Sequence, residues 1–306
     1  MSKTGWLIND CLTCIPNTKT FWHFLLDSID GLQDKTGGYT NFSFLAQNIE
    51  KNLAFDSPDY IIRNATFFRT IRSHIPTISL LQDPYPVDSV LFNNQLDVCN
   101  NSDFVVYNSE YTKNLYSNFI STPSEVIELG TDSSLFKQTN FDKKSDTIIY
   151  IGSTNEEFKR FSMILNLIEK TNYNFILVMK DDFIMNNPRV KVYNKINQAK
   201  LSTLINQSDV LVCTSNKETL HLAGIEAMFC NVPVVAPDVG IYSKIKKQEG
   251  WGKIVDKPNF SCYNRAIKEV LNSANNPRKV MEENNLSIDH CCLRWKNLIN
   301  NLMEKK

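Results

Sequence analysis

The stretch from residue 218 to residue 240 reads ETLHLAGIEAMFCNVPVVAPDVG and combines a short helical pattern, a buried strand and a turn. A carboxylate stands at each end of the helical part, at Glu218 and at Glu226. On an ideal helix these positions lie about 12 Å apart along the axis and about 80° apart around it, so both side chains face one side. Paired acid and base carboxylates of a glycosidase usually lie within about 10 Å of each other. The wider spacing instead suits two contacts at opposite ends of an elongated ligand.

Residues 219 to 222 form the first turn of this predicted helix. The first amide groups of a helix have no partner within the helix, and together with the helix dipole they attract anionic oxygen atoms. The sequence therefore predicts a phosphate site between the two glutamates. The alternative is that both glutamates are ordinary solvated helix charges.

Short apolar runs alternate with longer amphipathic segments along the rest of the chain. The expected strands before residue 137 are Trp6–Ile8, Tyr60–Ile62, Thr77–Leu81, Phe104–Tyr107 and Val126–Glu128. Beyond the polar stretch KQTNFDKKSD at 137–146, which we interpret as a linker, the expected strands are Thr147–Ile151, Asn174–Met179, Val190–Tyr193, Asp209–Cys213 and Pro233–Ala236. The expected helices are Thr20–Ile29, Glu110–Phe119, Lys159–Lys170, Ala199–Gln207 and Thr219–Phe229.

This alternation is typical of parallel α/β proteins. It predicts two Rossmann-like domains, residues 1–140 and 141–306, whose strands end in loops at a shared cleft. We leave open whether the C-terminal helix packs back on the N-terminal domain.

Composition narrows the class of protein. The chain has 306 residues, enough for two domains, and its 33 basic and 33 acidic side chains balance, so no overall charge attracts nucleic acid or an anionic membrane. No apolar run approaches the roughly 18 residues of a membrane span, and the N-terminus lacks the apolar segment of a signal peptide. The 8 dispersed cysteines favour free thiols in a reducing compartment. We expect a cytoplasmic protein, with peripheral membrane contact left open.

The run SDVLVCTSNKETLHLAGIEAMFCNVPVVAPDVG, residues 208–240, resembles the C-terminal signature of GT-B glycosyltransferases of the large retaining family 4. The shared elements are a strand ending in Ser, E-x7-E, E-A-M, a Pro-Val-Val strand and an Asp-x-Gly turn. The resemblance implies that Glu218 contacts hydroxyls of a donor sugar and that Glu226 holds the ribose of the nucleotide. It also implies that the intervening amides hold the distal phosphate, at Thr219, Leu220, His221 and Leu222.

Two other segments of the C-terminal half resemble the same family. Gly152 and Ser153, followed by Lys159, resemble the glycine turn and the diphosphate-binding lysine that open its C-terminal domain. A lysine suits that place because a departing nucleoside diphosphate gains negative charge, although a solvated helix lysine is the ordinary alternative. A segment that contains Ile196, Asn197 and Lys200 resembles the region of the family that binds the nucleotide base.

In the N-terminal half, two motifs resemble the family's strand-helix unit D-x-V-x-x-x-S and its G-x-D-x-x-x-F entry to the interdomain crossing. Their residues are Asp103, Ser109, Gly130, Asp132 and Phe136.

The chain also departs from the family pattern. Ser153 stands where members commonly have an arginine, and His221 and Asn231 replace glycines. The N-terminal glycine pair appears as Asn17-Thr18. Asn tolerates left-handed backbone geometry better than most residues, so these turns can persist. The departures raise the alternative of a nucleotide-sugar-binding protein with a degenerate site.

Two further motifs point to other chemistry. Cys11 and Cys14 have the spacing of a redox or zinc pair, but no second pair follows at zinc-site distance, so we expect structural thiols. Asp181 and Asp182 form an acidic pair, which we interpret as a turn after a strand rather than as a metal site.

The resemblance implies transfer of a hexose-like sugar from a nucleotide sugar, such as a UDP- or GDP-sugar, to an acceptor hydroxyl, with retention and with neither a metal nor a cofactor. No side-chain nucleophile is expected, because retaining members are thought to react on the front face, with the leaving phosphate helping to deprotonate the acceptor. The candidate catalytic residues are Lys159, Glu218 and Asp83. Asp83 lies in the loop LLQDPYP and is the candidate acceptor contact; a turn-capping role before Pro84 is its alternative.

The acceptor stays open among glycan, lipid, protein and modified nucleic acid, and neutral charge disfavours DNA only mildly. A phosphorylase, an epimerase or a related enzyme on the same fold is a second alternative to transfer.

Overall fold

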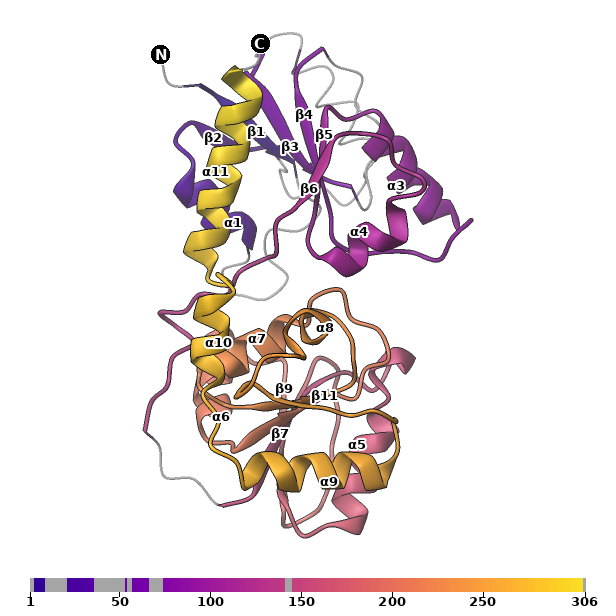
Figure 1. Cartoon of the computed structure of the whole chain (residues 1–306), viewed down its shortest axis with the longest axis vertical. Coiled ribbons are helices and arrows are strands. Elements are labelled where there is room, and N and C mark those ends of the chain that lie inside the picture. The colour runs from indigo at the N-terminus through magenta and orange to yellow at the C-terminus, as the bar shows by residue number, and fades with distance from the viewer. Residues whose placement is uncertain are drawn as a thin grey trace. The chain divides into compact units, whose positions relative to one another are not determined.

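The computed structural model describes residues 3–8, 21–35, 53, 57–65, 74–140 and 145–304. The described residues form two compact units (Figure 1): the first contains those up to Leu129 and from His290 onward, and the second contains Gly130–Asp289. The ranges expected from the sequence are 1–140 and 141–306. Among the described residues, no helix combines the length and the apolar character that a membrane crossing requires.

The first unit contains a six-stranded sheet in which all paired strands are parallel, in the order β2-β1-β3-β4-β5-β6. Its strands are β1 (Gly5–Ile8), β2 (Leu32–Asp34), β3 (Tyr60–Asn64), β4 (Thr77–Leu81), β5 (Phe104–Tyr107) and β6 (Ser124–Val126). The helices that contribute to this unit are α1 (Phe21–Ser28), α3 (Val90–Asn100), α4 (Glu110–Tyr116) and most of α11 (Ile288–Glu304). Strands such as β3 and β4 are buried along their whole length, as expected of a parallel sheet covered on both faces.

The second unit contains another six-stranded parallel sheet, in the order β12-β11-β10-β7-β8-β9. Its strands are β7 (Thr147–Gly152), β8 (Asn174–Met179), β9 (Val190–Asn194), β10 (Val210–Val212), β11 (Val234–Ala236) and β12 (Gly252–Ile254). Its helices are the short η1 (Glu157–Lys159), α5 (Phe161–Lys170), α6 (Gln198–Asn206), α7 (Leu222–Phe229), α8 (Ile241–Ile245), α9 (Phe260–Leu271) and α10 (Pro277–Glu283). The two parallel sheets confirm the predicted α/β class.

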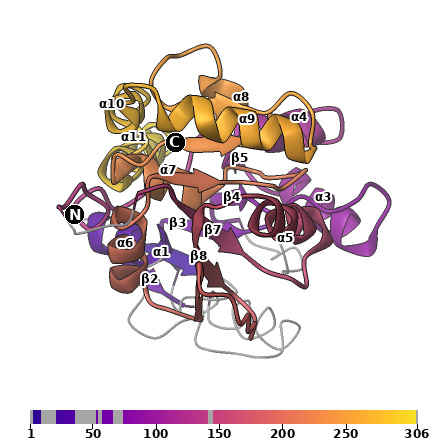
Figure 2. The same cartoon turned by 90° about the horizontal axis from the view of Figure 1, so that it is seen from below.

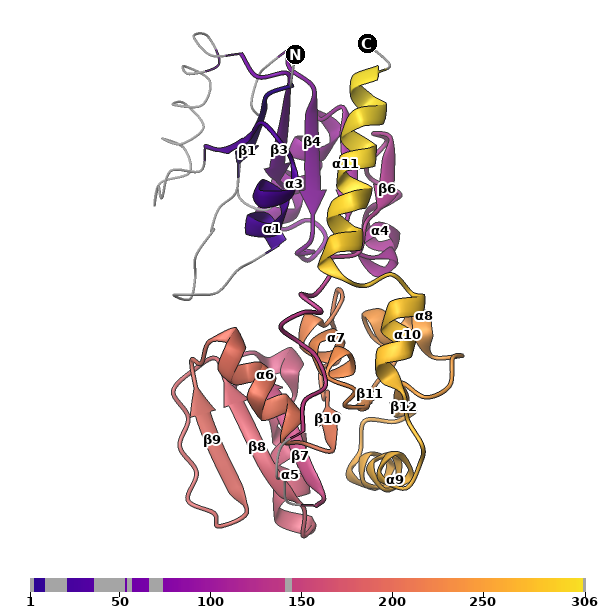
Figure 3. The same cartoon turned by 90° about the vertical axis from the view of Figure 1, so that its left-hand side faces the viewer.

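One face of the second sheet is covered by α5 and α9 (Figure 2 and Figure 3), and α9 also contacts β11. The apolar residues of α5 recur at helical spacing and are buried at Phe161, Ile164, Leu167 and Ile168. They share one core with Ile148 and other buried residues of the sheet. Burying an aliphatic side chain of this size contributes about 1.5 to 3 kcal/mol to the stability of the fold. This core therefore holds the strands in place, and with them the loops that follow the strand ends.

The order of the second sheet contains a switch point between β7 and β10. From β7 the chain builds β8 and β9 on one side, and it then returns to place β10 on the other side of β7. The loops after β7 and β10 therefore diverge at the carboxyl ends of neighbouring strands. In open α/β sheets this is where ligands bind.

Many predicted boundaries differ from the observed ones by one to three residues, and three of these differences change the interpretation of the sequence. The strand expected at Val126–Glu128 is β6 at Ser124–Val126. The helix expected from Lys159 is interrupted at Arg160, whose φ of 48° is left-handed. As a result α5 begins at Phe161. The helix expected from Thr219 begins at Leu222, because His221 has a left-handed φ of 66°. Propensity at a helix start is a weaker determinant than the loop that leads into it.

The segment that enters the second unit is a capped turn. Thr131 bridges to Ser287, and a Cβ atom added at Gly130 would collide with the Ser287 carbonyl group. The Asp132 carboxylate accepts hydrogen bonds from the Ser134 amide (3.0 Å) and the Leu135 amide (3.2 Å). Gly130 and Asp132, singled out by resemblance, thus have evident structural roles.

Candidate functional site

Lys159 and Glu218 form an ion pair at the switch point of the second sheet. Lys159 ends η1 in the loop after β7, and Glu218 lies in the segment between β10 and α7. Lys159 Nζ lies 2.7 Å from Glu218 Oε1, and the two side chains are only 16% and 11% exposed. The fold therefore brings together two residues that are 59 positions apart in the sequence.

Backbone contacts hold these two loops together. Thr214 donates its hydroxyl to the Lys159 carbonyl at 2.5 Å, and the Asn216 amide donates to the Phe158 carbonyl at 2.9 Å. The left-handed Arg160 turns the chain into α5 directly after the lysine. Lys159 is thus positioned by the loop and is not a residue of an exposed helix face.

The carboxyl group of Glu218 is stabilised in its ionised form. Burial by itself raises its pKa, but the positive charge of Lys159, with hydrogen bonds from Lys159 and Ser215, opposes burial, and the pKa lies below its ordinary value. A partly buried charge pair of this kind is screened less by salt than a surface pair.

His221 lies next to this pair and is buried, with 7% of its surface exposed. Its Nδ1 atom is hydrogen-bonded to the Tyr242 hydroxyl, and the Tyr242 ring stacks on Trp251 with 5.4 Å between ring centroids. Burial lowers the pKa of His221 to about 4, against the opposing effect of Glu218, so the imidazole is neutral at physiological pH. The sequence offered no signal for Tyr242 beyond an aromatic residue two positions after the Asp-x-Gly turn.

The phosphate site predicted from a helix start at Thr219 needs correction. Thr219 and Leu220 precede α7, so Glu218 is not a helix residue and the helical geometry assumed for the two glutamates does not apply. In the described chain, the amides of Leu222 and Ala223, at the true start of α7, have no hydrogen-bond partner. These two amides are now the candidate anion ligands.

Glu226 lies on α7 and is half-buried. The described part of the chain contains no ion-pair or hydrogen-bond partner for its carboxylate, and burial raises its pKa to about 7. A half-buried carboxylate without a protein partner is costly to a folded chain. Glu218, in contrast, has the Lys159 cation as a partner for its carboxylate.

The Asp-x-Gly turn shapes the segment that carries Glu218. Gly240 has a φ of 54°, and an added Cβ atom would lie 2.9 Å from the Leu220 carbonyl oxygen and 3.3 Å from the Glu218 Cβ. Asp238 accepts hydrogen bonds from Ser243 and Lys246, at 2.7 and 2.6 Å. The glycine is therefore required both by its backbone angle and by the close approach of this segment.

Ser153 is a structural residue of the loop after β7. Its buried hydroxyl accepts a hydrogen bond from the Asn155 amide at 3.1 Å. An added Cβ atom at the preceding Gly152 would collide with the Tyr150 hydroxyl. Ser153 thus supplies no positive charge to the site, whereas Lys159 does.

Asp181 and Asp182 each have protein partners. The Asp181 carboxylate accepts a hydrogen bond from the Thr154 hydroxyl, which lowers the pKa of Asp181 to about 2, and Asp182 pairs with Lys195 at 2.7 Å. These contacts agree with a turn rather than a metal site.

The predicted nucleotide-base residues lie around the start of α6. Asn197 caps this helix by accepting a hydrogen bond from the Lys200 amide at 2.9 Å, and Lys200 Nζ lies 5.5 Å from the Tyr193 ring centroid. In the described residues, no hydrogen bond or ion pair joins Ile196, Asn197 or Lys200 to the Lys159–Glu218 pair. Their contact with a nucleotide base stays a prediction.

In the first unit, Asp83 is exposed and its carbonyl group accepts a hydrogen bond from Gln95 Nε2 at 2.7 Å. Asp103 accepts a hydrogen bond from the Thr77 amide at 2.8 Å, and Ser109 caps α4. Acceptor contact by Asp83 stays a prediction. The pairs Cys11/Cys14 and Asn17/Thr18 lie outside the described residues.

The ligand atoms of Cys213, Glu218 and His221 lie within 4.8 Å of one another, which tests the expectation that no metal is needed. The Lys159 ammonium group already contacts Glu218 at 2.7 Å. Glu218 is thus already paired with a side-chain cation, and a reaction without a metal stays a prediction.

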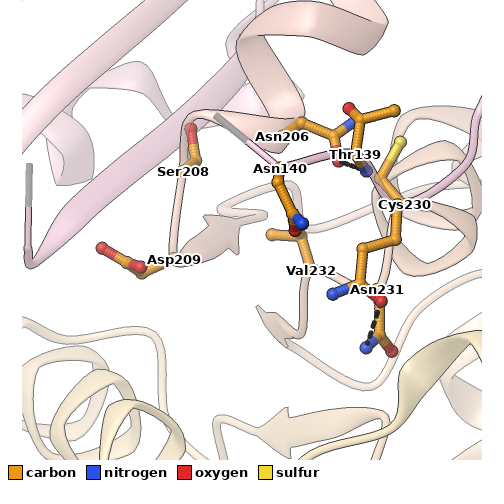
Figure 4. Close-up of a pocket in the computed structure, with 9 residues that line it drawn as sticks. Thr139, Asn140, Asn206, Ser208, Asp209, Cys230, Asn231 and Val232 are labelled. Carbon is orange, nitrogen blue, oxygen red and sulfur yellow. Dashed lines mark hydrogen bonds between the residues drawn. The ribbon is translucent and has the colours of Figure 1, made fainter. Parts of the chain in front are cut away.

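A polar pocket of about 200 Å³ lies at the other end of the same sheet (Figure 4). Asp209 and Val232, which directly precede β10 and β11, are among its lining residues. Asn231 also lines it and has a left-handed φ of 61°, a geometry that asparagine tolerates better than most residues. This pocket is therefore distinct from the switch-point loops.

A parallel α/β unit of this order is of the Rossmann type, in which ligands bind at the switch point. Residues 132–287, just over half of the chain, match the model of the family described as glycosyl transferases group 1, and the chain belongs to this family. A comparison with the curated proteins gave no match.

Solved structures of glycosyltransferases share the GT-B fold with this chain. Sucrose-phosphate synthase from Thermosynechococcus elongatus is similar with a TM-score of 0.80 at 14% identity, covering 99% of this chain and 100% of that one. Anabaena HepE, solved with UDP and glucose, has a TM-score of 0.70 at 13% identity, with 97% and 100% covered. A Rickettsia africae glycosyltransferase has a TM-score of 0.71 at 14% identity, with 100% of both chains covered. These similarities confirm the predicted GT-B fold.

Proposed function

We propose that the chain transfers a hexose-like sugar from a nucleotide sugar to an acceptor hydroxyl, with retention at the anomeric carbon. The observation that carries this proposal is the Lys159–Glu218 pair at the switch point of the second sheet, with its atoms 2.7 Å apart. A cation and a carboxylate at that point supply the two contacts that a nucleotide sugar needs, one for phosphate and one for sugar hydroxyls.

In this proposal Lys159 stabilises the negative charge that grows on the diphosphate as the glycosidic bond breaks. The unpaired amides of Leu222 and Ala223 supply hydrogen-bond donors to the same phosphate. No metal is required because the cation is a side chain. The front-face reaction assigns no side-chain nucleophile, and the leaving phosphate helps to deprotonate the acceptor.

UDP is the first nucleotide to consider because HepE was solved with UDP and glucose. Asp83 is the proposed acceptor contact, and the acceptor is a glycan, lipid, protein or modified nucleic acid. The 8 dispersed cysteines favour a reducing compartment and so a cytoplasmic protein, with peripheral membrane contact open. The competing function is nucleotide-sugar binding without transfer, favoured by Ser153, which lacks the cation that family members commonly have there.

Transfer is tested with a panel of UDP- and GDP-sugars, using release of the nucleoside diphosphate and mass spectrometry of the product. We expect slow hydrolysis of one donor without acceptor and faster release with a suitable hydroxyl acceptor. NMR of the new anomeric centre reports retention, and the assay is repeated after chelation. Tight donor binding with no release under any condition would instead establish the binding protein.

Glu226 is proposed to hold the ribose, and Glu226→Ala should therefore weaken binding of UDP itself. Hydrogen bonds to a charged group contribute about 1.5 to 3 kcal/mol, which predicts a loss of about tenfold to a hundredfold in affinity. Calorimetry on the folded variant measures this loss. Unchanged affinity would remove Glu226 from the ribose site.

The raised pKa of Glu226 also predicts a pH dependence. Its folded-state pKa is about 7 against an ordinary 4.5, so its contribution to the free energy of unfolding falls as pH rises between these values. UDP affinity should rise as the pH passes through about 7, where the carboxylate of the folded chain ionises. Glu226→Gln is the control, since it keeps the pH dependence that belongs to the diphosphate and loses the part due to Glu226.

A further inference from the structure

The hydrogen bond between His221 and Tyr242 determines which ring nitrogen of His221 carries the proton. Burial raises the pKa of the Tyr242 hydroxyl well above its ordinary value, so this group keeps its hydrogen. Its hydrogen-bond partner in the described chain is His221 Nδ1. A buried hydroxyl hydrogen needs an acceptor, so Tyr242 donates, Nδ1 accepts with its lone pair, and the neutral ring carries its proton on Nε2.

The second nitrogen of the ring, Nε2, is not fully enclosed. Nε2 has no hydrogen-bond partner in the described chain. The buried side-chain atoms that lack a partner there include Tyr150 Oη, Asn194 Oδ1 and Trp295 Nε1, and Nε2 does not belong to this group. This nitrogen therefore reaches the surface although most of the ring is buried. An Nε2–H group there is an available donor.

The backbone and the packing together fix this orientation. The left-handed φ of His221 places the residue at the cap position of α7, directly before the unpaired amides of Leu222 and Ala223. An added Cβ atom at Gly224 would collide with the Tyr242 hydroxyl and lie 2.7 Å from His221 Nδ1. Gly224 therefore provides the space in which the two side chains meet.

The charged and titratable groups around the ring explain why it is a neutral donor. Glu218 favours the imidazolium form, whereas burial and the Lys159 ammonium group oppose it. The Cys213 thiol stays protonated and adds no charge. The imidazole thus supplies a hydrogen bond without a second positive charge beside Lys159.

We propose that His221, held in its Nε2–H form by Tyr242, donates a hydrogen bond to a phosphate oxygen of the donor nucleotide, and that Tyr242 is the positioning residue for this contact. This inference rests on the proposed function, because a nucleoside diphosphate must be the ligand. Phosphate oxygens accept hydrogen bonds and donate none in their ionised form. They therefore suit a place where Lys159, two backbone amides and Nε2–H all donate.

The protonated nitrogen is measured first, by NMR of the free protein labelled with ¹⁵N-histidine. The chain has only 4 histidines, and the signals lost in His221→Asn identify those of His221. We expect the Nε2–H form, without titration between about pH 5.5 and 8, and a change at Nε2 on addition of UDP. A proton on Nδ1, or an imidazolium form at neutral pH, would overturn the inference without affecting the proposed function.

The second arm compares Tyr242→Phe with Tyr263→Phe. Tyr263 is also buried, and its hydroxyl donates to the Cys213 carbonyl at 3.0 Å, so this control removes a nearby buried hydroxyl without touching His221. In Tyr242→Phe we expect mixed protonation of the two ring nitrogens and a loss of about fivefold to tenfold in UDP affinity. Tyr263→Phe should keep the Nε2–H form and bind UDP within about twofold of wild type.

Thermal melts confirm that each variant is folded, and His221→Asn, whose residue type tolerates left-handed geometry, supplies a second folded test of the same contact. Equal UDP affinities in Tyr242→Phe and Tyr263→Phe would show that Tyr242 is only structural and would overturn the inference. Wild-type protein that binds neither UDP nor GDP would overturn the proposed function together with the phosphate contact.

Discussion

Glu218→Ala should lower sugar transfer by about thirtyfold to a thousandfold while UDP affinity stays the same or rises. The carboxylate lies beside Lys159 and, in the proposed function, positions the donor sugar, a contact that strengthens in the transition state and contributes about 2 to 4 kcal/mol to lowering the barrier. Diphosphate binding does not need this contact, and loss of the carboxylate frees the Lys159 ammonium group, 2.7 Å away in the intact pair, for phosphate.

Calorimetric titration with UDP and a transfer assay on the same preparation measure the two effects. Glu218→Gln is the matched variant, because it keeps the shape of the side chain and one acceptor oxygen, removes the charge and replaces the other oxygen with a donor NH2 group. Preference among donor sugars should relax in both variants, since a site that bonds one particular hydroxyl no longer rejects sugars that lack it. A UDP-binding and turnover profile indistinguishable from that of Glu226→Ala would contradict the proposed division between the two glutamates.

Lys159→Ala should lower turnover by about a hundredfold and weaken donor binding much less. Only the charge that appears on the diphosphate during bond breaking adds to the rate, and Lys159 is the cation placed for it. The substitution also leaves the Glu218 carboxylate, only 11% exposed, without its ion-pair partner. This unpaired negative charge would repel the negative charge that grows on the diphosphate.

Lys180→Ala is the control for this variant. Lys180 follows the neighbouring strand β8 and pairs with Glu156 at 3.0 Å, but its side chain is 77% exposed, so its removal should leave turnover near wild type. A double-mutant cycle of Lys159 and Glu218 should be non-additive, because the two side chains are in contact. Turnover of Lys159→Ala within about threefold of wild type, less than 1 kcal/mol, would assign this lysine a structural role.

Much of the fold is predictable because fully buried parallel strands are continuous apolar runs. Thr77–Leu81, Phe104–Tyr107 and Asn174–Met179 are strands with the predicted bounds. Short edge strands such as Leu32–Asp34 and Gly252–Ile254 are missed, since three residues carry no periodic signal.

The candidate site was predictable only in part. Glu218 and Glu226 are found by spacing, but the spacing argument assumed one continuous helix, and the left-handed His221 invalidates that assumption. Tyr242 could not be predicted, because its role depends on the space at Gly224 and on the stacking with Trp251.

By itself, the sequence determined the alternation of strands and helices, the balance of charge, and the family to which residues 132–287 belong. These properties follow from local patterns, which are set by neighbours a few positions apart. The tertiary structure decided which charges meet: Lys159 reaches Glu218 because β10 returns to pair with β7, and no local pattern records that return. It also decided the ionisation of Glu226 and the protonated nitrogen of His221, because burial and hydrogen-bond partners exist only after the chain has folded.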